Sequence, residues 1–216
     1  WFAGSCVYNS QWLTIHESTV VLQDADVGYD IKVIGSGTPF VNNGATVAAK
    51  NFIYSNPNAV TITVAGGTYT VAESLYFDSQ DTSSGTTFQL NADLLVNGAG
   101  LIHVSSSAAG LAKLDTTVSN YNITASELQV ADSLFRAGFI YANNSTIDIN
   151  GDVIFAYSAN TTVNLAGSSW FVEGNWSNNS TTFSAGTSTV ELDGVNQSLF
   201  GSTSFYNLTK IESSND

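Results

Sequence analysis

The sequence predicts an all-β protein, a right-handed parallel β-helix (a β-solenoid) with coils of about 20 to 25 residues. Apolar and polar residues alternate with a period of two along most of the chain, and helical periodicity is nearly absent. Short segments rich in β-branched residues are separated by turns rich in glycine and asparagine. One strand pattern also recurs along the chain at a roughly constant step. A β-sandwich, which spaces short strands with similar regularity, is the alternative.

The recurring strand has the pattern apolar–x–small–polar–large–x–apolar, and we expect it once in each coil. Its large residue is expected to point into the core, and its small residue to mark a tight corner or a close approach of two coils. Between successive large residues the steps are 23, 19, 34, 25 and 23 residues, so the long step predicts an insertion or one extra coil. The large residues are Phe52, Leu75, Leu94, Leu128, Val153 and Trp176, and the small ones are Ala49, Ala72, Ala92, Ala125, Gly151 and Gly174.

Two regions stand apart from this pattern. Residues 1–18 do not follow it and are expected to form an N-terminal cap or an assembly strand, because an open solenoid end must be blocked or joined. Residues 19–216 are then one β-solenoid domain. The alanine-containing segment 105–114 is the one candidate for a helix, and 78–85 is expected to be an exposed loop. Short strands are expected at 19–22, 29–34, 60–64 and 189–192.

Composition excludes several classes of function. The chain has 18 acidic and 5 basic residues, a formal net charge of −13, and only 11% charged residues. Binding to nucleic acid or to an anionic membrane surface is therefore not expected, because no basic patch exists to neutralise phosphates. No stretch is apolar enough to span a bilayer as a helix. Cys6 is the single cysteine, so no internal disulfide can form.

An acidic surface can bind calcium or can simply keep a protein soluble. Asp24, Asp26 and Asp30 supply carboxylates at alternating positions and are the candidate metal ligands. Their spacing does not match an EF-hand loop, in which a glycine and a terminal glutamate have fixed places. Calcium is therefore the one candidate cofactor, and no other cofactor is expected.

Enzymatic residues are sparse. The two histidines, His16 and His103, are far apart in the sequence, and no Gly-x-Ser-x-Gly nucleophile elbow is present. Asp148 and Asp152 alternate with apolar residues and are expected to face outward together, as solvated acids usually do. We therefore expect no enzyme. A polysaccharide-binding or polysaccharide-cleaving β-helix is the alternative, with a groove of acids and exposed aromatic residues: Tyr54, Tyr76, Trp170 and Trp176.

Glycosylation sequons (Asn-x-Ser/Thr) occur only in the C-terminal half of the chain. Chance competes with function here, because asparagine, serine and threonine are abundant, and glycosylation requires a cell that performs it. The candidate sites are Asn122, Asn144, Asn160, Asn175, Asn179, Asn196 and Asn207, with further sequons at Asn143 and Asn178.

The segment from Gly174 to Thr209 contains motifs that are similar to those of a known type of repeat. It contains Gly-Asn-Trp at 174–176, Ala-Gly-Thr-Ser-Thr-Val at 185–190 and Gly-Ser-Thr-Ser-Phe-Tyr-Asn-Leu-Thr at 201–209. These motifs resemble the tandem repeats of large bacterial secreted and surface (adhesin-like) β-helix proteins. The resemblance implies an extracellular right-handed β-helix stalk, in a family mostly without assigned activity. The chain departs from the repeat at Leu199-Phe200, a position that a cap or a contact could occupy.

These observations together predict a non-catalytic extracellular structural protein, a surface stalk or adhesin segment or a filament subunit that assembles end to end. Its partners would be copies of itself, or other cell-surface proteins or glycans. Exposed end strands favour such joining. The expected contact residues lie at the two ends of the solenoid: Trp1, Phe2 and Trp12 at one, and Phe200, Phe205, Tyr206 and Leu208 at the other.

Overall fold

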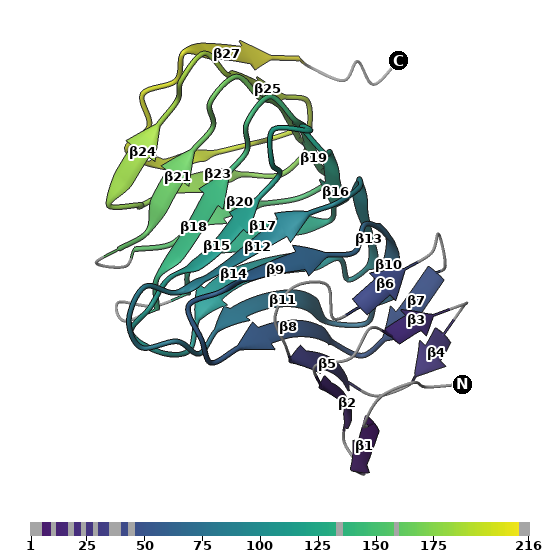
Figure 1. Cartoon of the computed structure of the whole chain (residues 1–216). Helices are drawn as coiled ribbons and strands as arrows, with labels where there is room; N and C mark the ends of the chain where they lie inside the picture. Colours follow the sequence, from purple (N-terminus) through teal and green to yellow (C-terminus); the bar gives the residue numbers. More distant parts are fainter. Residues whose placement is uncertain are drawn as a thin grey trace.

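The computed structural model shows an all-β chain whose parallel sheets stack into a β-solenoid, which confirms the predicted fold class (Figure 1). It describes residues 6–9, 12–16, 20–22, 25–27, 30–34, 40–42, 46–132, 136–157 and 160–211. Among the described strands, every pair is parallel except β1 with β2. No helix occurs in the described part of the chain.

Three long sheets form the sides of the stack. The ten-stranded sheet contains β1 (Cys6–Asn9), β2 (Trp12–His16), β5 (Asp30–Ile34), β8 (Phe52–Asn56), β11 (Ser74–Ser79), β14 (Leu101–Ser106), β17 (Glu127–Val130), β20 (Val153–Phe155), β23 (Trp176–Asn178) and β26 (Leu199–Gly201). The nine-stranded sheet contains β4 (Ala25–Val27), β7 (Thr46–Ala49), β10 (Gly67–Val71), β13 (Leu94–Gly98), β16 (Ile123–Ala125), β19 (Thr146–Ile149), β22 (Ser169–Val172), β25 (Thr189–Leu192) and β27 (Asn207–Lys210).

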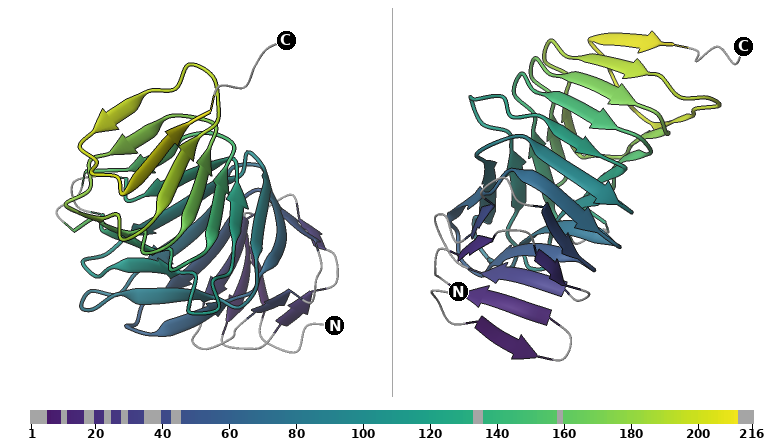
Figure 2. Two further views of the ribbon diagram at one scale, coloured as in Figure 1. Left: turned by 90° about the horizontal axis from the view of Figure 1, so that it is seen from above. Right: turned by 90° about the vertical axis from the view of Figure 1, so that its right-hand side faces the viewer.

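The six-stranded sheet contains β9 (Thr61–Val64), β12 (Thr86–Leu90), β15 (Ala112–Asp115), β18 (Gly138–Tyr141), β21 (Thr162–Asn164) and β24 (Thr182–Ser184). Near the N-terminus its place in the coil order is taken by a pair of strands, β3 (Val20–Leu22) and β6 (Phe40–Asn42). Figure 2 shows the coils stacked one upon another from the N-terminal to the C-terminal end.

A full coil therefore carries one strand from each of three sheets. The recurring strand does occur once in each coil, because Phe52, Leu75, Leu128, Val153 and Trp176 lie in one column of the ten-stranded sheet, but Leu94 was wrongly assigned to it. The mismatch arises at Leu94, which lies in the nine-stranded sheet and not in the column of Leu75. Leu75 pairs with Ile102, and Ile102 pairs with Leu128, so these steps are 27 and 26 residues (102 − 75 and 128 − 102). The long step was thus an error of register, and no extra coil or insertion is present there.

Two local expectations also fail. Segment 105–114 is not a helix, because β14 ends at Ser106 and β15 begins at Ala112. The loop after β11 is exposed only in part: Asp81 is 7% exposed, and its carboxylate accepts hydrogen bonds from the backbone N–H groups of Ser83 and Gly85. Buried aspartates that cap their own loop in this way are common in turns.

The core is a continuous column of inward side chains along the stack. In the ten-stranded sheet one inward row is completely buried from Ile31 through to Trp176. Aromatic rings fill its C-terminal part, where Trp176 lies 5.2 Å from Phe155 and 5.7 Å from Trp170 between ring centroids. Toward the N-terminal end of the stack, the buried Tyr54 and Tyr69 hydroxyls lie 2.9 Å apart. Burial raises the pKa of Tyr54 far above its ordinary value, so it stays neutral.

Corners between the nine-stranded and ten-stranded sheets are tight, as expected for Gly151 and Gly174. A β-carbon on Gly174 would lie 2.2 Å from the carbonyl carbon of Gly151 in the coil below. A ladder of side chains ties these corners together: the backbone N–H of Asn175 donates to Asp152 (2.7 Å), and that of Ser198 donates to Asn175 (2.8 Å). Ala92 lies at a different corner, against Gly66.

Candidate functional site

A shallow hollow on the outer face of the ten-stranded sheet gathers polar and charged side chains from successive coils. One outward row runs through Lys32, Ile53, Tyr76 and His103, which are in register on β5, β8, β11 and β14. The hollow measures about 210 Å³. We call it the His103 hollow; its lining is Lys32, Ile53, Tyr76, Asp78, His103, Ser105, Ser107 and Arg136.

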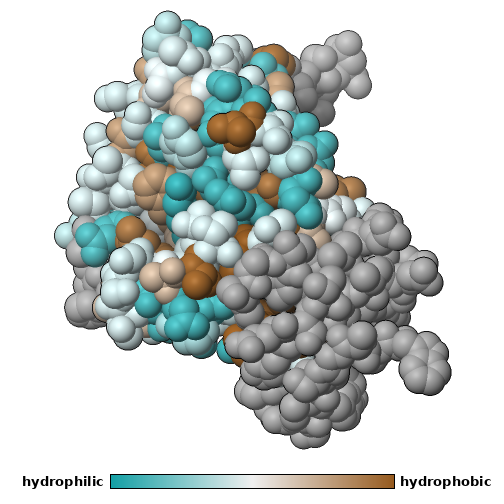
Figure 3. Space-filling view, in the orientation of Figure 1, coloured by the Kyte–Doolittle hydropathy of each residue, from teal (hydrophilic) through white to brown (hydrophobic). Residues whose placement is uncertain are grey.

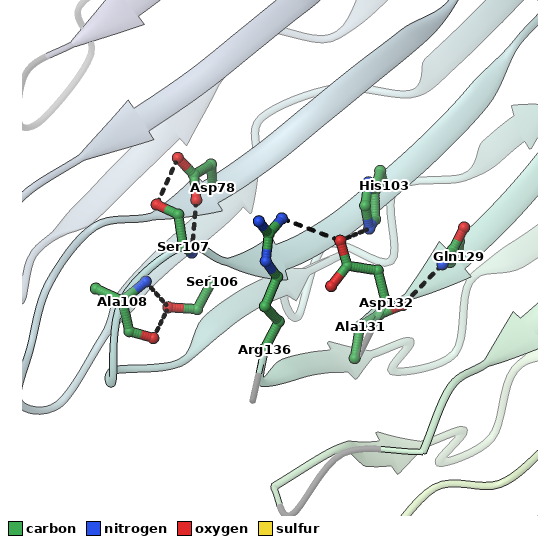
Figure 4. A network of polar contacts seen from close by, with 9 residues as sticks. All are labelled: Asp78, His103, Ser106, Ser107, Ala108, Gln129, Ala131, Asp132 and Arg136. Carbon is green, nitrogen blue, oxygen red and sulfur yellow. Dashed lines mark hydrogen bonds and ion pairs between the residues drawn. The ribbon is translucent and has the colours of Figure 1, made fainter. Parts of the chain in front are cut away.

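The connection from β17 to β18 brings a charged pair to this face (Figure 4). Arg136 Nη1 lies 3.1 Å from Asp132 Oδ2, and the same carboxylate oxygen is 3.7 Å from His103 Nε2. On the other side, the backbone N–H and the hydroxyl of Ser107 donate to Asp78, at 2.9 and 3.1 Å. Two acids and one arginine thus frame the histidine.

His103 is unusual because it is buried but not fully hydrogen-bonded. The residue is 7% exposed, and its ring lies 5.0 Å from that of Tyr76. The 3.7 Å separation from Asp132 exceeds hydrogen-bond distance, and no described residue accepts from or donates to Nε2. The hydroxyl of Ser105, also buried, is without a hydrogen-bond partner among the described residues.

Burial lowers the pKa of His103 below 6.5, its ordinary value; Asp132 opposes the shift and Arg136 adds to it. The unfolded chain therefore binds a proton at a higher pH than the folded chain does. The free energy of unfolding should fall as the pH drops through about 6.5, with a slope of up to about 1.4 kcal/mol per pH unit from this residue. The stabilisation is present above that pH and is lost as the pH falls toward the lowered pKa.

Urea denaturation of the wild type and of His103→Gln, over a pH series from about 7.5 to about 5, measures this contribution. The variant should lose the His103 part of the slope, while the other groups that face the hollow (Asp78, Asp132, Arg136 and Lys32) remain in both proteins. Identical pH dependence in the two proteins would contradict the assigned burial effect.

A second hollow, of about 490 Å³, lies on the outer face of the nine-stranded sheet. Its acids are Asp93 and Asp148. Burial, and then the charge of Asp193, raise the pKa of Asp148. Asp93 is engaged as an acceptor for the backbone N–H of Asn122 (2.7 Å). Asp152, expected to face outward with Asp148, lies at the corner between β19 and β20, where its carboxylate accepts hydrogen bonds from the backbone N–H and the side-chain amide of Asn175.

The aromatic groove expected for a polysaccharide protein is absent from the described surface. Tyr54, Trp170 and Trp176 are completely buried in the core, which corrects their expected exposure. The reason is strand parity: these residues fall in the inward rows, and a one-residue change of register is all that separates an inward from an outward position. Tyr76 alone of the four lies in an outward row.

Besides the two hollows, the C-terminal end of the stack is a third candidate functional surface. Leu199 and Leu208 continue the inward rows of Trp176 and Val190, yet they are 50% and 43% exposed because no described coil lies beyond them. β24, β26 and β27 each stand at the end of their sheet. The chain runs from β26 to β27 without a strand in the six-stranded sheet, so the last coil is incomplete.

This incomplete coil closes the core only in part. Phe205 packs against Trp176 with ring centroids 5.5 Å apart, and the Trp176 indole N–H donates to Thr203 Oγ1 at 3.1 Å. Phe200 and Tyr206 are 54% and 60% exposed. Of the expected contact residues at this end, Phe200, Tyr206 and Leu208 are therefore accessible, and Phe205 is mostly used within the chain.

At the other end, β2 joins the parallel stack through β5, and β1 lies antiparallel on β2. Trp1 and Phe2 lie outside the described residues, as does the side chain of Trp12. Of the candidate calcium ligands, Asp24 lies outside the described residues, as does the side chain of Asp26. Asp30 is described, and its carboxylate accepts a hydrogen bond from Asn51 (3.0 Å).

The candidate glycosylation sites differ in accessibility. Asn175 is the exception among them, because its side chain binds Asp152 and accepts from Ser198. Asn178, a further sequon, is 2% exposed. The remaining candidates are exposed: Asn122, Asn144, Asn160, Asn179, Asn196 and Asn207.

Sequence reasoning did not find the His103 hollow. Lys32, Ser105, Asp132 and Arg136 share no motif, and only the lengths of successive coils bring them together. In comparisons with protein-family models, with curated proteins and with solved structures, nothing matches this chain. Within the described residues no helix has the length and apolar character that crossing a membrane requires.

Proposed function

We propose that this chain is a non-catalytic extracellular structural protein, a β-solenoid rod that joins end to end with copies of itself. The observation that carries the proposal is the C-terminal end, where inward-row residues Leu199 and Leu208 are half exposed beside three terminal strands. Such an end offers both apolar surface and backbone hydrogen-bonding groups for a further coil. The extracellular setting rests on the resemblance of residues 174–209 to secreted repeats.

Two features of the body of the rod favour a structural over a catalytic role. The large aromatic residues lie inside the coils, where they stiffen the core and do not form a substrate groove. The polar residues at the corners form hydrogen bonds that link one coil to the next, as Asp152, Asn175 and Ser198 do. On the face that Figure 3 shows, outside the grey region, teal and pale residues predominate and brown ones are scattered, so this face carries no continuous apolar patch.

A second copy is the occupant that best fits the C-terminal end. A partner must supply strands to three sheets at once, around an apolar centre of the same cross-section. In this proposal the N-terminal end of another copy supplies them, where β1 and β4 are the outer strands of the ten- and nine-stranded sheets. Head-to-tail contact repeats the same step without closing and therefore builds an open chain of molecules. The net charge of −13 opposes contact, so association should strengthen as salt screens the repulsion.

Sedimentation over a concentration series tests the proposal. Wild-type protein should form species larger than dimers, and the double variant Leu199→Asp/Leu208→Asp should raise the dissociation constant by about a hundredfold, since two apolar contacts are lost. Leu95→Asp is the matched control, because Leu95 is similarly exposed (38%) but lies on the side of the rod. Monomers at every concentration, a mass that stops at the dimer, or an equal effect of the control would contradict end-to-end assembly.

A further inference from the structure

The His103 hollow has the properties of a small binding site, independent of the open end. It lies on the side of the rod, where β5, β8, β11 and β14 each contribute an outward side chain. Arg136 also lines it, and its guanidinium is held by Asp132, 3.1 Å away (Figure 4).

Two buried polar atoms beside the hollow point to an occupant. His103 and Ser105 both line the hollow and are more than nine-tenths buried. Neither His103 Nε2 nor the Ser105 hydroxyl has a hydrogen-bond partner among the described residues. Polar atoms buried in this way are costly unless something satisfies them. A ligand with hydrogen-bonding groups would remove that cost.

The charges of the hollow indicate a neutral ligand. Lys32 and Arg136 contribute two positive charges and Asp78 and Asp132 two negative ones, while burial keeps His103 neutral near pH 7. Such a balanced set does not attract a strong anion or cation. It presents donors and acceptors close together, which is what hydroxyl groups match, because each hydroxyl can both donate and accept.

The size and shape of the hollow limit the class of ligand further. A volume of about 210 Å³ is below the range of roughly 300–1,000 Å³ typical of drug-sized ligand pockets, so the hollow admits one small ring. Tyr76, half-buried beside His103, offers an aromatic surface for an apolar ring face. Ile53 adds a second apolar wall.

We propose that the His103 hollow binds a single pyranose unit of a neutral saccharide. The ring stacks on Tyr76 and its hydroxyls pair with the framing carboxylates, and the His103 and Ser105 side chains turn toward the ligand so that Nε2 and Oγ gain partners. The rod would then hold glycans on its side while it assembles through its end. The two activities are separable, because the substitutions that block one lie far from the other.

The test uses the two histidines as reporters. In protein labelled with ¹⁵N-histidine, the His103 ring signals are assigned by their loss in His103→Gln. Cellohexaose and mannohexaose are the neutral probes, oligogalacturonate is the charged comparator and sorbitol the acyclic polyol. At least one neutral oligosaccharide should shift the His103 signals in a saturable way, with a dissociation constant on the order of 1 mM.

Tyr76→Ala should weaken this binding by about tenfold, and Tyr157→Ala is the matched control, because Tyr157 is exposed (63%) and lies outside the hollow. The Leu199→Asp/Leu208→Asp variant should bind as the wild type does, which separates this proposal from end-to-end assembly. No saturable shift with either neutral probe, equal binding of sorbitol, binding of oligogalacturonate alone, or unchanged binding in Tyr76→Ala would overturn it.

Discussion

Trp176→Ala is expected to lower the free energy of unfolding by about 3 to 5 kcal/mol, the range seen when a large buried aromatic side chain is removed. Trp176 is completely buried on β23, within ring contact of Phe155, Trp170, Phe183 and Phe205. Its indole N–H also donates to Thr203, so the substitution releases the connection that covers the end of the core. Urea denaturation followed by circular dichroism measures the loss.

The damage from Trp176→Ala should be local. Coils in a solenoid contact only their neighbours, so opening at β23 need not propagate to distant coils. Hydrogen exchange should therefore show protection lost in β22 to β27 and kept in β8 to β14. Ser177→Ala, the neighbouring outward residue, is the matched control and should change the free energy of unfolding by less than about 0.5 kcal/mol. A uniform loss of protection along the chain would contradict coil-by-coil stability.

Gly174→Ala is expected to destabilise the protein by about 1 to 3 kcal/mol or more, although it adds a single methyl group. The added β-carbon would lie 2.2 Å from the carbonyl carbon of Gly151 and 2.5 Å from the backbone nitrogen of Asp152. These neighbours are backbone atoms, which cannot rotate away as a side chain could. The corner must open, and the hydrogen bond from the Asn175 backbone to Asp152 (2.7 Å) should weaken with it.

Thermal denaturation of Gly174→Ala, compared with Glu173→Ala, measures this effect. Glu173 is the preceding residue at the same corner and is exposed, so its truncation should leave the melting temperature nearly unchanged. If both variants melt alike, the close approach of the two coils at this corner is not a determinant of stability.

Much of the fold could be predicted because alternation is strong wherever one strand face is buried. The inward positions of Phe52, Leu75, Leu128, Val153 and Trp176 follow from that alternation and pair in a single row of the ten-stranded sheet. Gly174 and Gly151 were also recognisable as corner residues from their place in the recurring pattern. These features depend only on the order of residues within one strand or turn, so they can be predicted from the sequence.

The number of strands per coil could not be predicted in the same way. Strands of all three sheets alternate with period two, so the pattern around Leu94 looks like that around Leu75 although the two lie in different sheets. Inward and outward positions are equally hard to tell apart in short strands. Tyr54 and Tyr76 both follow an apolar residue, but one is fully buried and the other lies in the outward row.

The His103 hollow depends on register alone. Lys32 and Ile53 are 21 residues apart, Ile53 and Tyr76 are 23 apart, and Tyr76 and His103 are 27 apart, so no fixed repeat aligns them. Arg136 arrives from a connection whose path the strand pattern does not specify. Sites of this kind become visible only when the coils are stacked.

Electron microscopy of the wild-type protein at high concentration, beside Leu199→Asp/Leu208→Asp, tests the central claim most directly. Wild-type molecules should form linear rods of several units, joined where the C-terminal end of one meets its neighbour, and the double variant should appear as single short particles. Wild-type particles that remain single, or rods that persist unchanged in the double variant, would show that the open end is not an assembly surface.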